Sequence, residues 1–596
     1  MKILLIAVNA KYIHSNLAVY SLRASAEKQG EQAGILEFTI NQQEDEILRA
    51  ICREKPDVGG FSVFLWNGAV YRRLARALHD FLPVLGMWLG CPAVSWDAEK
   101  VMEELPFLSG ILIGEGEESF RQLCRCFRLR NPGELETVPG LLYRDREGRL
   151  IRTGEAPLPD LDSLPFPYEN LQKFENRILY YESSRGCPFS CSYCLSSLDR
   201  SLRYRSLALV FRELALFLRE RVRQVKFVDR TFNADRKRAA AIWKFLREND
   251  NGITNFHFEI EADLLGEEEL RELRKMRPGL VQLEIGVQTT NPETLKAVHR
   301  RMDFARLCRN VQRIGSGGNI HQHLDLIAGL PGEDLQSFAR SFCQVYALHP
   351  QQLQLGFLKV LKGTPLAAET EKWKLRHKAA APYEILGNRW LPYEDILQLK
   401  LVEEMVEVYY NSGQFRVTLE AAETRFPDAF SLYQKLGRYY EEEGYLSVSH
   451  TRIRRYEILG EFLEKEIPRE TERFRECLVC DLYARENVKN RPAWAGEQML
   501  PRDRVRKFYE EEAENPEILK IYTGRDWRQL KSMTHLEEFR EEIPGFRKGR
   551  KWLLFDYERR SPLDGSAAVL DVTDRMEGNA SLGQRDANEH ERMEDV

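Results

Sequence analysis

The sequence contains no long apolar run. Its N-terminal stretch, MKILLIAVNAKYIHS, is broken by Asn9 and Lys11, which leaves it too short to span a bilayer, and no small-residue cleavage site follows. We therefore expect a cytoplasmic protein that has neither a secretion signal nor a membrane partner. The stretch itself is typical of a buried strand.

An excess of one charge is also absent. The net charge is -5 over 596 residues, with acidic and basic residues interspersed, so no global field indicates binding to nucleic acid or an anionic membrane. The fractions of hydrophobic residues (43%) and charged residues (30%) are typical of a globular chain. The length predicts two to four domains.

Alternating apolar and helix-period segments predict an α/β protein with three folded regions. Apolar runs near the N-terminus begin at Lys2, Ile35, Val58, Leu85 and Ile111 and predict a Rossmann-like, doubly wound parallel sheet. Six later strands separated by helices predict a partial (β/α)6 barrel. The expected divisions are 1–135 for the Rossmann-like domain, 136–172 for a hairpin and proline-rich linker, 173–370 for the barrel, 371–573 for a mainly helical domain, and 574–596 for a disordered tail.

Eleven cysteines without a secretion signal are not expected to form a disulfide framework. Cys187, Cys191 and Cys194 form the pattern C-x3-C-x2-C in RGCPFSCSYC, on the loop that leaves the first barrel strand. Thiolates are the usual ligands of iron–sulfur clusters, and three of them leave one iron of a [4Fe-4S] cluster open to a substrate. The alternative is a zinc site, which would ordinarily use four ligands and C-x2-C spacings.

This segment resembles the signature of the radical S-adenosylmethionine (radical SAM) superfamily, and the resemblance extends over roughly residues 175–370. It implies that the open iron binds the methionine moiety of S-adenosylmethionine, with Tyr193 near the adenine. It further implies that Asp229 in FVDRTFN meets the methionine amine and that Gln288 in EIGVQTTN lies near the ribose. In LIAGLPGE, the resemblance places three residues against the adenine: Gly329, Pro331 and Gly332.

Structural roles remain open for these later residues. A buried Asp after a strand is often a helix cap, and Gln288 is compatible with a satisfied core amide. Asp229 and Gln288 therefore carry both interpretations. Glu261 is a weaker candidate for a direct ligand contact, because it can pair with a nearby arginine.

The front domain resembles the cobalamin-binding domain that precedes the radical domain in one subfamily. Ser62 in GFSVF and Gly90 in LGCP match it, since small residues let a corrin and its nucleotide tail approach the sheet edge. The subfamily's Asp-x-His-x-x-Gly motif is missing, and Cys91 replaces one glycine of a pair. His14, the only imidazole in the first loop, is a candidate cobalt ligand or a packing residue.

Two other interpretations of the front domain stay open or are disfavoured. A degenerate scaffold or a substrate-recognition module is one alternative. A dinucleotide site is disfavoured because G-x-G-x-x-G does not follow the first strand. GEGEESF, at Gly114, follows the last strand and is acidic, which indicates a helix start.

The C-terminal region resembles an extension of unknown function found on some cobalamin-type radical proteins. Cys477 and Cys480 have C-x2-C spacing but no second pair downstream, and the leucines around them favour a buried helix face. An auxiliary cluster completed by distant residues is the alternative.

These patterns predict an enzyme that reductively cleaves S-adenosylmethionine to methionine and a 5′-deoxyadenosyl radical, with an electron donor such as flavodoxin or ferredoxin. The front domain favours a cobalamin-dependent methyltransferase acting on an unreactive carbon of an unknown substrate. One alternative is a radical enzyme without cobalamin that modifies RNA or peptide. The other is a non-catalytic iron–sulfur carrier or scaffold.

Overall fold

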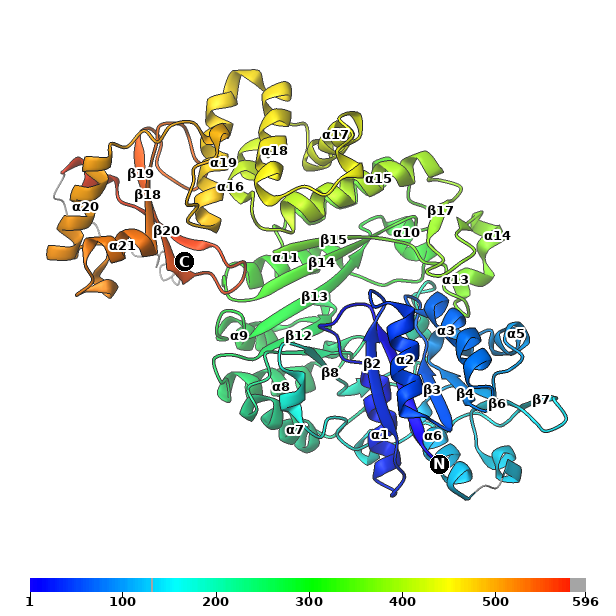
Figure 1. Ribbon diagram of the computed structural model, residues 1–596. Helices are drawn as coiled ribbons and strands as arrows, with labels where there is room; N and C mark the ends of the chain where they lie inside the picture. The colour runs from blue at the N-terminus through cyan, green and yellow to red at the C-terminus, as the bar shows by residue number, and fades with distance from the viewer. Residues whose placement is uncertain (130–131, 579–596) are drawn as a thin grey trace. The chain divides into compact units, whose positions relative to one another are not determined.

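The computed structural model describes residues 1–129 and 132–578. The chain divides into two compact units, residues 1–397 and residues 398–596 (Figure 1). Part of the expected tail, 579–596, lies outside the described residues, whereas its first residues belong to a short helix, α22 (Thr573–Glu577). Across the described ranges, every helix is too short or too polar to cross a membrane.

The front of the first unit is a seven-stranded sheet in the order β2-β1-β3-β4-β5-β6-β7. β1 to β5 are parallel, as predicted, and the β6–β7 hairpin adds two antiparallel strands. We expected this hairpin in the linker, but Gly110 lets it approach the sheet: a Cβ there would lie 2.8 Å from the Leu142 carbonyl oxygen. The strands are Ile3–Asn9, Gly34–Thr39, Val58–Ser62, Gly86–Gly90, Gly110–Leu112, Leu141–Arg144 and Leu150–Arg152.

Helices cover both faces of this sheet. α1 (Leu17–Glu27) packs against α6 (Gly116–Leu129), and α2 (Glu44–Glu54) packs against α3 (Gly68–Phe81). Right-handed crossovers that run outward from β1 in both directions put these pairs on opposite faces. The strand order reverses between β1 and β3, which is where doubly wound sheets bind ligands at their carboxyl ends.

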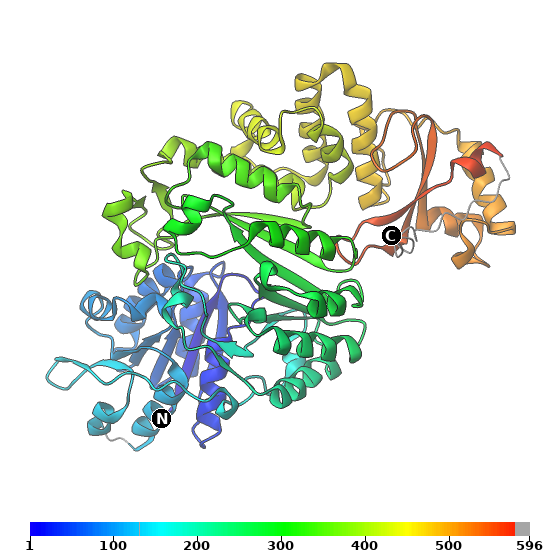
Figure 2. The same cartoon turned by 180° about the vertical axis from the view of Figure 1, so that it is seen from behind.

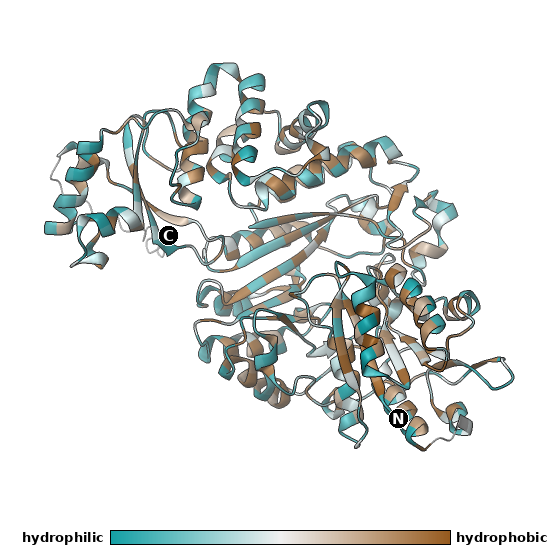
Figure 3. Cartoon of the chain, viewed as in Figure 1, coloured by the Kyte–Doolittle hydropathy of each residue, from teal (hydrophilic) through white to brown (hydrophobic). Residues whose placement is uncertain are grey.

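The radical-domain region folds into an open six-stranded parallel sheet in the order β15-β14-β13-β12-β11-β8, which confirms the six predicted strands. Hydrophobic and hydrophilic residues alternate along these strands (Figure 3); along β13, for example, buried and half-buried residues alternate at every position. One face of the sheet is therefore polar. The strands are Ile178–Tyr181, Gln224–Phe227, Asn255–Ile260, Val281–Gln288, His321–Ala328 and Gln352–Phe357.

Helices between these strands cover the outer face of the sheet, as the reverse view shows (Figure 2). Most begin after a side chain that accepts a hydrogen bond from a backbone N–H of the first turn, which fixes where each helix starts. The helices are α7 (Leu207–Arg219), α8 (Arg236–Glu248), α9 (Glu267–Arg274), α10 (Pro292–Ala297), α11 (Phe304–Gly315) and α12 (Leu335–Tyr346).

The first unit continues past residue 370, where we expected the barrel to end. It includes α13 (Pro365–Ala368), α14 (Thr370–Trp373), a small hairpin of β16 (Arg376–His377) and β17 (Ile385–Gly387), and the first turn of α15 (Tyr393–Met405).

The second unit combines helices with a three-stranded antiparallel sheet, β18-β19-β20. Cys477 and Cys480 lie buried on α19 and are the only cysteines after residue 397, so the buried helix face is the interpretation that fits. The larger helices are α16 (Arg416–Glu423), α17 (Ala429–Glu442), α18 (Arg452–Glu466), α19 (Thr471–Arg485), α20 (Arg502–Glu514) and α21 (Trp527–Met533); the strands are Thr534–Phe539, Lys551–Arg560 and Ala567–Asp571.

Candidate functional site

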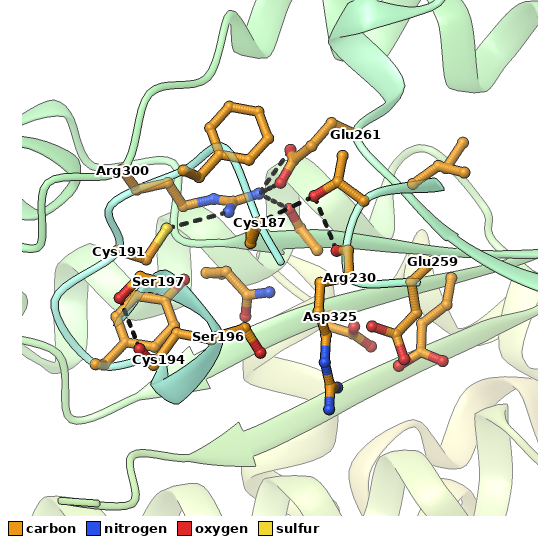
Figure 4. Close-up of a pocket in the computed structure, with 17 residues that line it drawn as sticks. Cys187, Cys191, Cys194, Ser196, Ser197, Arg230, Glu259, Glu261, Arg300 and Asp325 are labelled. Carbon is orange, nitrogen blue, oxygen red and sulfur yellow. Dashed lines mark hydrogen bonds and ion pairs between the residues drawn. The ribbon is translucent and has the colours of Figure 1, made fainter. Parts of the chain in front are cut away.

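The three clustered cysteines lie on one loop after β8 and line one cavity of about 180 Å³ (Figure 4). The loop is tied down by backbone hydrogen bonds from Cys187 to Asp199 and from Ser192 to Val298. At its start, Gly186 has a φ of +94°, and a Cβ there would lie 2.7 Å from a backbone oxygen. Only glycine fits that position without strain.

An arginine that the sequence did not single out lies beside the cysteines. Arg300 bonds through its guanidinium to the Cys191 sulfur at 3.8 Å and to both carboxylate oxygens of Glu261 at 2.8 Å (Figure 4). Glu261 therefore pairs with an arginine, which is the structural role that the sequence suggested for it. Burial raises the pKa of the Cys191 thiol, and the guanidinium acts in the opposite direction by favouring the thiolate.

The cavity meets the requirements of a three-ligand cluster. Its described lining contains these three thiols and no fourth cysteine, so a [4Fe-4S] cluster held here would keep one iron open. Thr231, whose hydroxyl lies 3.8 Å from the Cys187 sulfur, adds a polar neighbour from the loop after β11.

Two residues predicted from the superfamily resemblance line this cavity with the cysteines: Tyr193 and Gln288. The Gln288 Oε1 atom is buried and has no hydrogen-bond partner within the described structure. Gln288 also has a left-handed φ of +70°, a conformation that costs energy for a non-glycine residue and is frequent at ligand sites. An orphaned acceptor here suits a ligand hydroxyl better than it suits a satisfied core amide.

Asp229 lies just outside the cavity lining. Its carboxylate accepts hydrogen bonds from the Ser183 amide (2.8 Å), the Ser183 hydroxyl (2.6 Å) and the Ser184 hydroxyl (2.8 Å). Burial raises the pKa of Asp229 to about 6, although these hydrogen bonds act to lower it. In this structure the Asp229 side chain holds Ser183 and Ser184, which lead into the cysteine loop. Its contact with a methionine amine stays a prediction.

Gly329, Pro331 and Gly332 form the turn after β14. Both glycines have left-handed φ angles, +91° and +90°, and a Cβ on Gly329 would lie 2.8 Å from the Ile385 side chain. Glycine is therefore required at Gly329 for close packing. Contact of this turn with adenine stays a prediction.

The polar face of the barrel sheet supplies three carboxylates to the same cavity: Glu259, Glu284 and Asp325. Lys226 and His257 lie 2.8 Å and 2.9 Å from the Glu284 carboxylate. Burial alone would raise the pKa of Glu284, but the neighbouring His257 imidazole and Lys226 ammonium outweigh burial and hold that pKa well below its usual range. The group is paired and anionic.

Glu259 is less well compensated. Its closest cation, the Lys226 ammonium, lies 3.9 Å away. Burial, together with the like charges of Glu284 and Asp325, raises the pKa of Glu259 to about 7. A carboxyl group with so few internal partners can accept a hydrogen bond or a positive charge from a bound molecule.

A second cavity, of about 530 Å³, lies between the front domain and the barrel, both within the first unit. The front domain contributes aromatic and apolar residues after β3 and β4: Phe64, Leu65, Trp66, Pro92, Ala93 and Trp96. Six residues line both this cavity and the cysteine cavity, so the two are adjacent: Tyr193, Cys194, Ser196, Arg230, Gln288 and Asp325. The volume is in the range of cofactor sites, and the lining suits a large, partly apolar ring.

The two candidate cobalamin contacts of the front domain, Ser62 and Gly90, lie behind the residues that line the second cavity. Ser62 is buried and bonds to Asn16 and to the Cys91 sulfur, two residues before the lining begins. Gly90 likewise precedes the lining residues Pro92 and Ala93. These two positions support the wall, and their contact with a corrin stays a prediction.

His14 points elsewhere. Its Nδ1 lies 2.7 Å from the Tyr180 hydroxyl on β8, and its backbone forms a bridge with Ile178. Burial lowers the pKa of His14, consistent with a neutral, packed imidazole. His14 is absent from the described lining of the second cavity; the structure shows a packed imidazole, and its role as a cobalt ligand stays a prediction.

Comparisons with known proteins identify three domains. The B12 binding domain matches residues 3–124, the radical SAM superfamily matches residues 181–342, and a protein family of unknown function, DUF4080, matches residues 371–555. The chain thus contains a B12-binding domain, a radical SAM domain and a C-terminal DUF4080 domain. These domain matches assign it three cofactors: a [4Fe-4S] cluster, S-adenosylmethionine and cobalamin.

Relatives are distant. An uncharacterized methyltransferase of Pyrococcus horikoshii, PH0819, is 23% identical over 366 residues, which are 59% of this chain and 75% of the relative. TokK of Streptomyces tokunonensis, a cobalamin-dependent radical SAM methyltransferase, is 25% identical over 382 residues, and the match covers 58% of this chain but only 53% of TokK.

The fold is shared with a solved structure. The cobalamin-dependent S-adenosylmethionine radical enzyme OxsB, with aqua-cobalamin and S-adenosylmethionine bound, matches 80% of this chain and 79% of its own length. The TM-score is 0.58 at 15% sequence identity. This likeness shows the fold alone.

Proposed function

We propose that this chain, a cobalamin-dependent radical SAM enzyme, transfers a methyl group to an unreactive carbon of its substrate. The observation that carries the proposal is the adjacency of the two cavities, which share the six lining residues named above. A substrate held between them would meet both cofactors. Distant relatives that are methyltransferases support the same reaction class.

When bound, the cluster and cobalamin supply reductive cleavage of S-adenosylmethionine and methyl transfer, respectively. Cys187, Cys191 and Cys194 would hold the cluster, and Gln288 would accept a hydrogen bond from a ribose hydroxyl. The aromatic side chains of Trp66 and Trp96 would seat the corrin and exclude water.

The carboxylates of the barrel would orient polar groups of the substrate. Glu259, whose closest cation is 3.9 Å away and is shared with Glu284, is the most available of them. The substrate itself is an unidentified molecule with a polar group within reach of this face.

The overall balance defines the partners. One substrate C–H bond and two molecules of S-adenosylmethionine, with two electrons, yield the methylated product, S-adenosylhomocysteine, methionine and 5′-deoxyadenosine. The electrons require a low-potential donor delivering them one at a time, and we propose a flavodoxin or a ferredoxin.

The test is anaerobic reconstitution with iron, sulfide and cobalamin, followed by reductant, methyl-deuterated S-adenosylmethionine and a metabolite extract. We expect retained corrin absorbance, 5′-deoxyadenosine and S-adenosylhomocysteine in equal amounts, and a product carrying the deuterated methyl group. A Cys191→Ala variant should yield neither 5′-deoxyadenosine nor the deuterated product. If 5′-deoxyadenosine forms without S-adenosylhomocysteine, methyl transfer is overturned. If cluster-loaded protein forms no 5′-deoxyadenosine, the radical reaction is overturned.

A further inference from the structure

The region matched by DUF4080 begins inside the radical-domain unit. The family match starts at residue 371, whereas the first compact unit extends to residue 397. Residues 371–397, which we call the bridging segment, therefore belong to both. Their contacts show what this first part of a region of unknown function does.

Main-chain hydrogen bonds tie the bridging segment to the end of strand β15. The Ile385 amide donates to the Leu358 carbonyl at 2.8 Å, and the Val360 amide donates to the Tyr383 carbonyl at 3.0 Å. Strand β15 pairs in turn with β14, the strand that ends at the Gly329 turn. The segment is thus an extension of the barrel's edge.

Two side chains of the bridging segment contact the Gly329 turn. Ile385 is fully buried against Gly329, where a Cβ would meet it at 2.8 Å. The Asn388 side-chain amide donates a hydrogen bond to the Gly329 carbonyl at 2.9 Å, while its oxygen accepts from the backbone amides of Trp390 and Leu391. Asn388 therefore links two backbone segments and fixes the orientation of one peptide group in the turn.

A third side chain reaches the second cavity. Tyr383 lines it together with Tyr193 and Gln288. The Lys362 ammonium lies 5.2 Å from the centre of the Tyr383 ring and pairs with Asp97 of the front domain. The position of this ring is thereby coupled to the docking of the front domain on the barrel.

We propose that the bridging segment contributes functional residues to the radical site. Asn388 is a positioning residue that holds the Gly329 turn in the shape that receives S-adenosylmethionine, and Tyr383 is a contact residue in the cavity where cobalamin and substrate meet. The inference rests on the proposed function, and its part on Asn388 rests also on the predicted contact of the Gly329 turn with S-adenosylmethionine.

The matched variants for the turn are Asn388→Asp and Asn388→Ala. The aspartate keeps the oxygen that accepts from Trp390 and Leu391 but turns a second acceptor toward the Gly329 carbonyl, so it replaces the clamp with repulsion, whereas the alanine removes it. Arg389→Ala, at an exposed neighbouring residue, is the control. Dissociation constants for S-adenosylmethionine are measured by equilibrium dialysis on cluster-loaded protein, with hydrogen exchange of the amides at 329–333 as a second readout.

We expect Asn388→Asp and Asn388→Ala to bind S-adenosylmethionine about 3- to 10-fold more weakly, the effect of losing one hydrogen bond, and to exchange the turn amides faster. Arg389→Ala should match the wild type in both. Unchanged affinity and exchange in the two Asn388 variants would overturn the clamp. A wild type that fails to bind S-adenosylmethionine at all would instead refute the proposed function.

Tyr383 is tested separately by corrin absorbance after desalting. Tyr383→Phe keeps the ring and Tyr383→Ala removes it, so we expect retention by the first variant and a several-fold loss in the second, with S-adenosylmethionine affinity unchanged in both. Equal retention by wild type and Tyr383→Ala would overturn the contact role, and the Asn388 result would be unaffected.

Discussion

Among the residues of the cysteine cavity, Glu259 is a carboxyl group with little compensation for its charge. Its pKa of about 7 in the folded protein lies above the ordinary value of a glutamate, because it is part-buried beside Glu284 and Asp325. A raised folded-state pKa means that the protonated form is favoured by folding, so stability is lost as the pH rises through about 7. A raised carboxyl pKa in the lining of a cavity is typical of a ligand site.

We therefore expect Glu259→Gln to be as stable as the wild type at pH 4.5 and more stable at pH 8, by about 1–3 kcal/mol. Glutamine keeps the shape and removes the charge. Thermal unfolding of the cofactor-free proteins at the two pH values measures the difference. A gap that does not widen with pH would show that the carboxylate is better compensated than its contacts indicate.

At the level of single residues, the cysteine motif and two of the later motifs predicted which side chains share one cavity, while their ligand contacts stay predictions. The cysteines, Tyr193 and Gln288 lie together as expected. The barrel carboxylates carried a weaker signal: in FHFEIEA and LVQLEIGV, polar residues alternate with apolar ones, which puts them on one face of a strand. Arg300 had no such signal, because it follows a short helix and reaches Cys191 only through the folded chain.

At the scale of elements, the strands and helices of the first unit follow from local patterns, whereas the place of the β6–β7 hairpin does not. Its pairing with β5 depends on a contact between segments far apart in the sequence. The C-terminal sheet shows the same limit, because β18 pairs with β19 across a long loop. Local periodicity specifies an element, and its partner is set by tertiary packing.

In the second unit, one buried carboxylate caps a helix from a distance. Asp481 on α19 accepts hydrogen bonds from the backbone amides of Val417 and Thr418, at 2.9 Å each, and from the Thr418 hydroxyl at 2.7 Å. These amides belong to the first turn of α16, whose own N-cap residue, Phe415, provides no side-chain hydrogen bond. Asp481 therefore satisfies donors that would otherwise be unpaired.

Asp481→Ala is expected to destabilise the second unit by about 1–3 kcal/mol, the combined effect of a lost cap and unsatisfied buried amides. Denaturant unfolding followed by circular dichroism measures the loss. Asp503→Ala, at an exposed position in the first turn of α20, is the control and should change stability little. Equal stability of the two variants would mean that water replaces the cap without cost.

At the scale of the whole first unit, function depends on how the front domain meets the barrel. Gly363 lies at this junction, with a left-handed φ of +85°, and a Cβ there would lie 2.3 Å from the Trp96 ring. Trp96 also lines the second cavity. Any side chain at Gly363 must displace this ring, which links the barrel loop directly to the wall of the cavity.

Gly363→Ala is therefore expected to weaken corrin retention by about 2- to 10-fold, the range for losing one well-placed aromatic contact, while binding of S-adenosylmethionine in the barrel stays unchanged. Gly318→Ala is the matched control, because Gly318 also has a left-handed φ (+61°), but a Cβ there would meet nothing within 4 Å. Both substitutions place a side chain at a left-handed φ, which costs about 1–2 kcal/mol, and they differ in that only the Gly363 side chain would meet the Trp96 ring. Equal corrin retention in the two variants would show that Trp96 adjusts freely and that the junction tolerates movement of this wall.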